Sequence, residues 1–252
     1  MIIYLTISSS SSLQNQMKGL TLSCITLMII KERSNMPSLT PSNRHYLIKY
    51  EMLNTITHAL GALAAIIGAI LLLVKAWQQH LSSLTLTALS IYAISMIGFL
   101  LASTLFHALV FTKAGKLFQF FDHSGIYFII LGSYTPYTWL FLPTNIGWPI
   151  WFTIAGCTVL GLIYDVFFVG RWPWLSVIIY VCMGWLVVLV FPMVYAALSP
   201  TSFILLLAGG IVYTIGAIFY LLPKIPYAHV YWHIFVLIAA TLMYISIYDM
   251  LF

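Results

Sequence analysis

The chain has 252 residues, of which 62% are hydrophobic and 6% are charged, and its mean hydropathy is +1.04. Soluble domains carry roughly 25% charged residues, so this composition excludes a water-soluble fold. The formal net charge is +5, but so few charges do not make a nucleic-acid surface. The partner that they indicate is a membrane with anionic lipid headgroups. The three cysteines lie far apart and indicate no disulfide framework.

The N-terminal residues differ in composition from the rest of the chain. A serine run covers residues 8–12, and the apolar stretch 20–30 is shorter than the roughly 20 residues that span a membrane. A secretory signal has a cleavage site of small residues after its apolar region, and no such site follows this stretch. The sequence therefore predicts a disordered leader over residues 1–46 and a single membrane domain over residues 47–252.

Seven apolar segments of membrane-spanning length follow the leader, and short connections separate them. They cover residues 53–74, 86–110, 124–142, 149–169, 174–196, 202–222 and 228–250. The segments lack the polar and apolar alternation over about ten residues that barrel strands show. Pro136 and Pro192 are expected to bend the third and fifth helices. The pattern predicts an all-α membrane protein, a bundle of seven transmembrane helices.

The distribution of positive charge predicts the orientation of this bundle. With the N-terminus in the cytoplasm, Lys75 is the one Lys or Arg outside, and nine lie on the cytoplasmic side. The nine are Lys18, Lys31, Arg33, Arg44, Lys49, Lys113, Lys116, Arg171 and Lys224. Because cytoplasmic loops carry an excess of Lys and Arg, we expect a cytoplasmic N-terminus and an external C-terminus.

Several polar residues meet at the cytoplasmic end of the predicted bundle, although ionisable groups are costly at membrane depth. His107 ends the second segment, Asp122 borders the start of the third, and His229 and His233 begin the seventh. The i, i+4 spacing of His229 and His233 puts both imidazoles on one helix face. Ser103 lies one turn before His107 on the same face. Three imidazoles with a carboxylate or water form a four-coordinate set suited to zinc.

Other uses of these residues stay open at this point. An isolated histidine pair on a membrane helix more often forms hydrogen bonds than binds a metal, and facing histidines can also hold haem. Neither alternative explains why Asp122 and Ser103 accompany the histidines. Glu51 and His58 share one face of the first segment. They could support the ligands, or they could be a carboxylate at a helix N-terminus and a histidine in an interhelical hydrogen bond.

Three further polar residues are expected to lie outside the metal site. His123 is about 100 degrees round the helix from Asp122 and is expected to point elsewhere. Asp165 is expected to pair with Arg171 across the membrane boundary, and Asp249 is expected to lie at the outer interface.

Four stretches of the sequence carry a resemblance to a known family. They are EMLNTITHALG (51–61), STLFH (103–107), FDHSGIYFIILGSYTP (121–136) and PYAHVYWHIFVL (226–237). Together they resemble the corresponding stretches of the bacterial hemolysin III family, which belongs with the progestin and adiponectin receptors. The resemblance covers about residues 47–252. It implies a seven-helix protein of the bacterial plasma membrane that holds zinc near the cytoplasmic face through His107, His229 and His233.

The resemblance also suggests an activity. In the wider group of related membrane hydrolases, residues that match Ser103 and Asp122 accompany the zinc, and members are linked to the hydrolysis of lipid amides such as ceramide. We therefore expect a zinc-dependent lipid amide hydrolase in which Asp122 handles the attacking water and Ser103 donates to the developing oxyanion. Two alternatives stay open: a receptor-like or membrane-homeostasis protein with structural zinc, and a cytolysin, as the family's name suggests.

Overall fold

A computed structural model describes the backbone of residues 41–252 and the side chains from residue 45 onward. Residues 1–40 of the predicted leader lie outside the described residues, and the boundary at residue 46 stays a prediction. The chain divides between Leu47 and Ile48 into two compact units, and the fold considered below is that of residues 48–252. The helix α2 crosses this boundary, because it begins at Pro41 and runs to Gln78.

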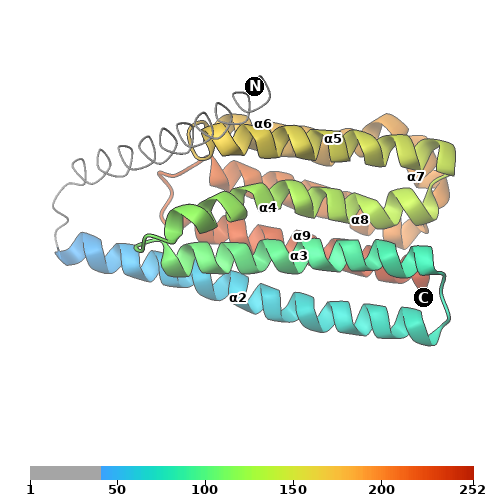
Figure 1. The fold of residues 1–252 in the computed structure, drawn as a ribbon, viewed down its shortest axis with the longest axis horizontal. Coiled ribbons are helices and arrows are strands. Elements are labelled where there is room, and N and C mark those ends of the chain that lie inside the picture. Colours follow the sequence, from blue (N-terminus) through green and yellow to red (C-terminus); the bar gives the residue numbers. More distant parts are fainter. Residues whose placement is uncertain (1–40) are drawn as a thin grey trace, which may run out of the picture. The chain divides into compact units, whose positions relative to one another are not determined.

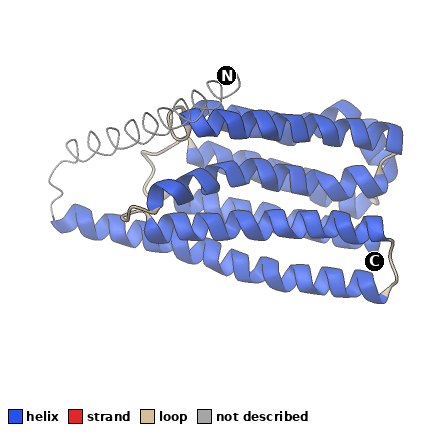
Figure 2. Ribbon diagram, in the orientation of Figure 1, coloured by secondary structure: helices blue, strands red, loops and turns tan. Residues whose placement is uncertain are grey.

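The described chain is helical, and residues 41–252 contain no strand (Figures 1 and 2). The long helices are α2 (Pro41–Gln78), α3 (Ser83–Leu109), α4 (Gly115–Pro136), α5 (Thr144–Phe168), α8 (Pro200–Tyr220) and α9 (Ala228–Leu251). One further span consists of α6 (Pro173–Gly184), the 3-10 turn η2 (Trp185–Val190) and α7 (Phe191–Ala197). Helix α3 packs along α4, and α8 packs along α9.

Six of these helical segments are long and apolar enough to cross a membrane. They are His45–Gln78, Ser83–Leu109, Thr144–Phe168, Pro173–Ala197, Pro200–Tyr220 and Ala228–Leu251. The remaining long helix, α4, is less apolar because its first half carries Lys116, Asp122 and His123, and the π-helical turn η1 (Tyr137–Phe141) extends it. The predicted all-α membrane bundle is confirmed, with α4 and η1 as its seventh helical segment.

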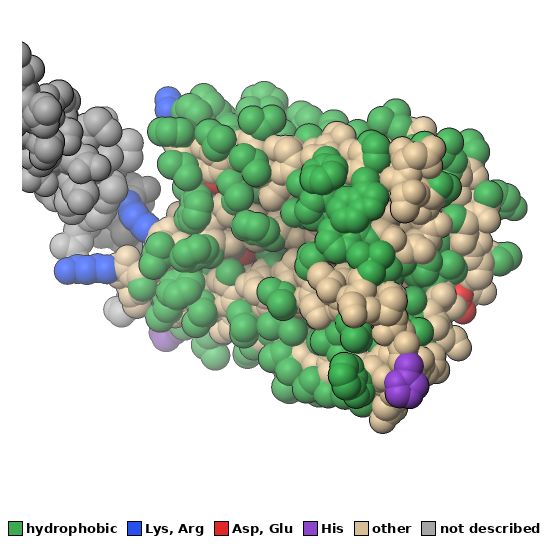
Figure 3. Space-filling model, turned by 45° about the vertical axis from the view of Figure 1, so that its right-hand side comes forward, with side chains coloured by type: hydrophobic (Ala, Val, Ile, Leu, Met, Phe, Trp, Pro, Cys, Tyr) green, Lys and Arg blue, Asp and Glu red, His purple; other side chains and the backbone are tan. Residues whose placement is uncertain are grey.

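The lipid-facing surface accounts for the composition of the chain. Apolar side chains are spread over the whole visible face in Figure 3, and some are largely exposed, such as Leu189 at 79% and Phe167 at 71%. In water such a surface would form apolar patches far larger than soluble monomers show. In a bilayer it faces lipid tails. The chain is therefore a multi-pass membrane protein.

Irregular turns occur beside both prolines that were expected to bend helices. Pro136 precedes η1, and Pro192 follows η2 in the first turn of α7. Backbone groups left unpaired at membrane depth need other partners, and the Tyr134 hydroxyl supplies them at η2. It accepts a hydrogen bond from the Val187 N–H at 2.9 Å and donates to the Gly184 carbonyl at 2.9 Å. The break in this span is thus compensated by a side chain of α4.

Close contact between α4 and α5 depends on a glycine. A Cβ atom added at Gly161 would overlap the ring of Tyr127, which is fully buried. A Cβ atom at Gly156, on the same helix, would meet no heavy atom within 4 Å among the described residues. The two glycines therefore have different structural roles although their sequence settings are similar.

We expect Gly161→Ala to lower the free energy of unfolding by about 1–3 kcal/mol, because the buried Tyr127 ring must move to admit the methyl group. The matched control is Gly156→Ala, which should leave stability unchanged or raise it by up to about 1 kcal/mol through helix propensity. Thermal unfolding of the purified proteins in detergent measures both. Equal effects of the two substitutions would contradict the close packing of α4 against α5.

Candidate metal centre

Three histidines from two helices lie close together, as predicted from the sequence. His107 lies in the last turn of α3, and His229 and His233 lie on successive turns at the start of α9. Each can offer one nitrogen, and these three nitrogens lie within 4.8 Å of one another. The ring centroid of His107 is 5.0 Å from that of His229 and 4.9 Å from that of His233. The arrangement can hold a metal ion.

A carboxylate on α2 orients the first of these rings. Glu51 Oε2 lies 2.6 Å from His107 Nδ1. Because a carboxylate accepts, Nδ1 carries the proton and Nε2 keeps its lone pair. That Nε2 is buried and has no hydrogen-bond partner in the described part of the chain. A carboxylate that holds the distal nitrogen of a histidine is typical of metal sites, so the structure favours the supporting role of Glu51.

A backbone carbonyl of α2 orients a second ring. His233 Nδ1 lies 3.2 Å from the Asn54 carbonyl oxygen and 3.1 Å from Thr57 Oγ1. A carbonyl can only accept, so Nδ1 again carries the proton, and Nε2 is left to bind a ligand. Helix α2 thus fixes the tautomers of two of the three histidines. Both nitrogens that remain free suit a metal such as zinc, which takes neutral imidazole.

A small polar cavity of about 20 Å³ adjoins the histidines, which is enough for one water molecule. His229, His233, Ser103 and Asp122 line it. Ser103 is fully buried, and its hydroxyl has no hydrogen-bond partner among residues 45–252. By contrast, Thr104 on the same helix donates to the carbonyl of its own preceding turn at 2.7 Å. The Ser103 hydroxyl is therefore available to a ligand in the cavity.

His123 does not lie where the sequence reasoning placed it. It lines the same cavity as Asp122 instead of pointing elsewhere, and its Nε2 is buried without a partner from the described chain. The reason is that the cavity extends past α4 towards Gly170, in the connection between α5 and α6, and Pro173, the first residue of α6. Residues about 100 degrees apart on α4 can then both face it.

The expected pairing of Asp165 with Arg171 is wrong. Asp165 is 1% exposed, and its Oδ2 accepts a hydrogen bond from Ser124 Oγ at 3.0 Å. Arg171 instead lies over the Trp172 ring, with its guanidinium carbon 4.9 Å from the centroid. The chain reverses at Gly170, whose φ is +71°, so Arg171 leaves the face of α5 that carries Asp165.

Asp249 is exposed near the C-terminal end of α9, and its place at the outer membrane interface stays a prediction. Its Oδ2 accepts hydrogen bonds from Ser199 Oγ at 2.6 Å and Ser202 Oγ at 2.7 Å. These serines begin α8, so the carboxylate ties the start of α8 to the end of α9.

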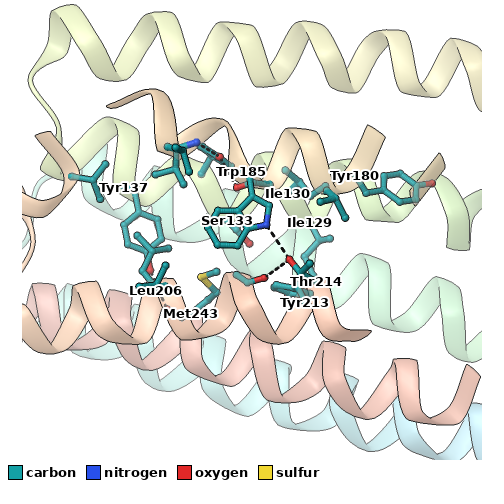
Figure 4. Close-up of a pocket in the computed structure, with 18 of the residues that line it drawn as sticks. Ile129, Ile130, Ser133, Tyr137, Tyr180, Trp185, Leu206, Tyr213, Thr214 and Met243 are labelled. Carbon is teal, nitrogen blue, oxygen red and sulfur yellow. Dashed lines mark hydrogen bonds between the residues drawn. The ribbon is translucent and has the colours of Figure 1, made fainter. Parts of the chain in front are cut away.

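An apolar cavity of about 190 Å³ adjoins the polar one. Four residues line both: Phe99, Ile126, Tyr180 and Trp232. Figure 4 shows side chains of α4, α6, α8 and α9 around it, and Trp185 Nε1 donates to Thr214 Oγ1 at 2.9 Å on its wall. Sequence reasoning missed this cavity, since its lining consists of residues that also suit an ordinary helix core.

Comparison with known proteins shows which family this chain resembles. A family profile described as Haemolysin-III related matches residues 46–244. Hemolysin-3 of Bacillus cereus is 38% identical over 79% of this chain and 91% of its own length. The Hemolysin-3 homolog of Bacillus subtilis (strain 168) is 35% identical over 80% of this chain and 94% of its own length. The human Monocyte to macrophage differentiation factor is 30% identical over 79% of this chain and 83% of its own length.

We expect Glu51→Gln to weaken zinc binding by about 10- to 100-fold, because the substitution removes the charged acceptor that orients His107. Competition of the purified protein with a zinc chelator measures this affinity. Asp249→Asn is the matched control, since it neutralises a carboxylate on α9 that contacts only serines in the hydrogen bonds above, and it should leave zinc affinity unchanged. Equal affinity of Glu51→Gln and the parent protein would contradict the supporting role of Glu51.

Proposed function

This chain belongs to the Haemolysin-III related family, and we propose that it is a zinc-dependent hydrolase that cleaves amide bonds of membrane lipids. One observation carries the proposal. Two of the three histidines line a small cavity together with Asp122 and Ser103, and the Ser103 hydroxyl has no partner among the described residues. A purely structural site uses its ligands to close the coordination shell, whereas this arrangement leaves room for a reacting group.

The ligand set supports zinc as the metal. Three neutral imidazoles with one further position resemble the open sites of zinc hydrolases. A zinc ion held by His107, His229 and His233 would supply Lewis acidity and make water a nucleophile near neutral pH. The residues themselves would perform the remaining steps of the reaction.

Asp122 and Ser103 would have separate roles in hydrolysis. Asp122 would orient the attacking water and accept its proton, and it would then pass that proton to the departing amide nitrogen. Ser103 would donate a hydrogen bond to the carbonyl oxygen as it gains negative charge. Water thereby adds across the C–N bond, and the products are a carboxylic acid and an amine.

The apolar cavity supports a lipid as the substrate. Its 190 Å³ of space lies beside the polar cavity, so an acyl chain in the first would place its carbonyl near the second. Burying each methylene contributes about 0.8 kcal/mol when it leaves water, but a lipid chain that enters from the bilayer gains mainly from packing. The substrate would enter between helices, and an aqueous cleft is not required.

The distribution of Lys and Arg over the loops supports an orientation in the bacterial plasma membrane with the N-terminus in the cytoplasm. Lys113, Arg171 and Lys224 lie in the connections α3–α4, α5–α6 and α8–α9, which alternate with those at the other end of an up-and-down bundle. Figure 3 shows Lys and Arg side chains gathered at one end of the visible face. Positive loops are cytoplasmic as a rule, which would put the metal centre near the cytoplasm.

The name of the Bacillus cereus relative, Hemolysin-3, supports a second candidate, a cytolysin. Release of a dye from lipid vesicles by the purified chain tests it directly. Dye release by the parent protein and equally by His233→Ala would favour a cytolysin over the hydrolase.

We expect the purified protein to contain about one zinc per chain and His233→Ala to contain none, because the substitution removes one of three ligands. Elemental analysis by mass spectrometry measures the metal. His45→Ala, which alters an exposed histidine of α2, is the control and should keep its zinc. A folded, active parent protein without metal would refute the proposed function.

We expect Asp122→Ala to keep its zinc and its melting temperature but to lose at least about 100-fold of its turnover, since general acid–base residues contribute about 10²–10⁴-fold. A fluorescent ceramide serves as the test substrate, and lipid analysis of cells with the intact chain or with His229→Ala identifies natural amides that accumulate. Collapse of the fold in Asp122→Ala would instead favour structural zinc.

A further inference from the structure

His58 is a buried histidine that the proposed metal centre does not use. It lies in the middle of α2, it is 1% exposed, and neither ring nitrogen has a hydrogen-bond partner within the described part of the chain. Buried polar groups are almost always hydrogen-bonded. A ring with two unpaired nitrogens therefore indicates a partner that comes from outside the chain.

Its geometry separates His58 from the metal ligands. The His58 ring stacks on His233, with centroids 3.5 Å apart and planes 16° apart. It also packs edge to face with the Phe99 ring, with centroids 5.6 Å apart. The lone pairs of an imidazole lie in the plane of its ring. Two stacked rings therefore point their lone pairs in two parallel planes, and these do not converge on one metal ion. The cluster of possible metal ligands among the described residues accordingly contains His107, His229 and His233 without His58.

His58 nevertheless lines the small polar cavity. Ser103 of α3 and Asp122 of α4 line the same cavity, and His58 reaches it from α2. The stack on His233 and the contact with Phe99 hold the ring in place. A fixed ring with an unused N–H beside a cavity is suited to bind a ligand oxygen.

In the proposed amide cleavage, the substrate carbonyl oxygen still lacks a second hydrogen-bond donor. The carbonyl oxygen gains negative charge when water attacks, and enzymes commonly stabilise it with two positioned donors. Ser103 has one O–H and can supply only one of them. A neutral imidazole also has one N–H, and it can act as a donor without changing its protonation state.

We propose that His58 is a catalytic residue of the hydrolase, in which its neutral ring donates a hydrogen bond to the substrate carbonyl oxygen beside Ser103. This inference rests on the proposed function, because it needs an amide carbonyl in the small cavity. It assigns a role to α2 beyond that of positioning His107 and His233. The same N–H would bind the carboxylate of a fatty-acid product.

The test compares zinc-loaded His58→Phe and His58→Gln with the parent protein and with the exposed-histidine control His45→Phe. We expect all four to keep one zinc, because His58 is not a ligand. The kcat for a fluorescent ceramide should fall about 10²–10³-fold in His58→Phe, the usual loss when one such donor is removed, with little change in KM. His58→Gln should recover part of the rate, since an amide N–H is also a donor.

A second measurement is independent of turnover. Calorimetric titration with oleic acid should show binding about tenfold weaker in His58→Phe than in the parent, and unchanged binding in His45→Phe. The melting temperature of His58→Phe should not fall, because an apolar ring replaces an unpaired polar one of similar shape.

Each contrary result has a distinct meaning. Loss of zinc in His58→Phe would make His58 a ligand, and unchanged kcat with unchanged oleic acid binding would make it a packing residue. Either would overturn the inference while the proposed function stands. If the parent protein contains no zinc, both fail together. If the parent binds zinc but does not cleave the ceramide, oleic acid binding still decides the role of His58.

Discussion

The hydrogen bond between Glu51 and His107 is the contact on which the geometry of the metal centre depends. It joins α2 to α3 at 2.6 Å, and a charge-assisted bond of this kind is strong in a medium of low dielectric constant. Without it, His107 could rotate or take the other tautomer, and its Nε2 would no longer face the two histidines of α9. A carboxylate at this depth would be costly alone, so Glu51 and His107 need each other.

The same helix is attached to its neighbours through further polar contacts along its length. Asn54 accepts from His233 of α9, and the Gly68 carbonyl accepts from the Tyr244 hydroxyl at 3.0 Å. Near the far end, the amine of Lys75 lies over the Tyr248 ring. Since lipid tails are as apolar as the helix surfaces, burial of apolar groups contributes little to association in a bilayer. Directed contacts of this kind therefore set the position of α2 and, with it, the supports of the metal centre.

Several buried polar groups without a partner gather around the small cavity and the histidine cluster. The Ser103 hydroxyl and both nitrogens of His58 are buried beside one small cavity, and the His107 Nε2 is buried in the neighbouring histidine cluster. None of them has a partner in the region that the structure describes. Buried atoms without a partner also occur on Tyr127, Trp139, Tyr164 and Tyr213, but none of these residues lines the small cavity, where several such groups meet. This concentration of unpaired groups supports the proposed site for a metal and a polar substrate group, next to the apolar cavity that we propose for a lipid chain.

The apolar segments and the short connections between them were enough to predict the helices. Because successive spans run in alternating directions, their order also predicted that His107, His229 and His233 meet on one side of the membrane. Spacing along α9 then decided that two imidazoles share a face. Only the tertiary structure decided that Glu51 supports His107, that His123 faces the cavity, that Asp165 bonds Ser124, and that an apolar cavity adjoins the centre. These features depend on how neighbouring helices are rotated and tilted, which a pattern within one helix does not contain.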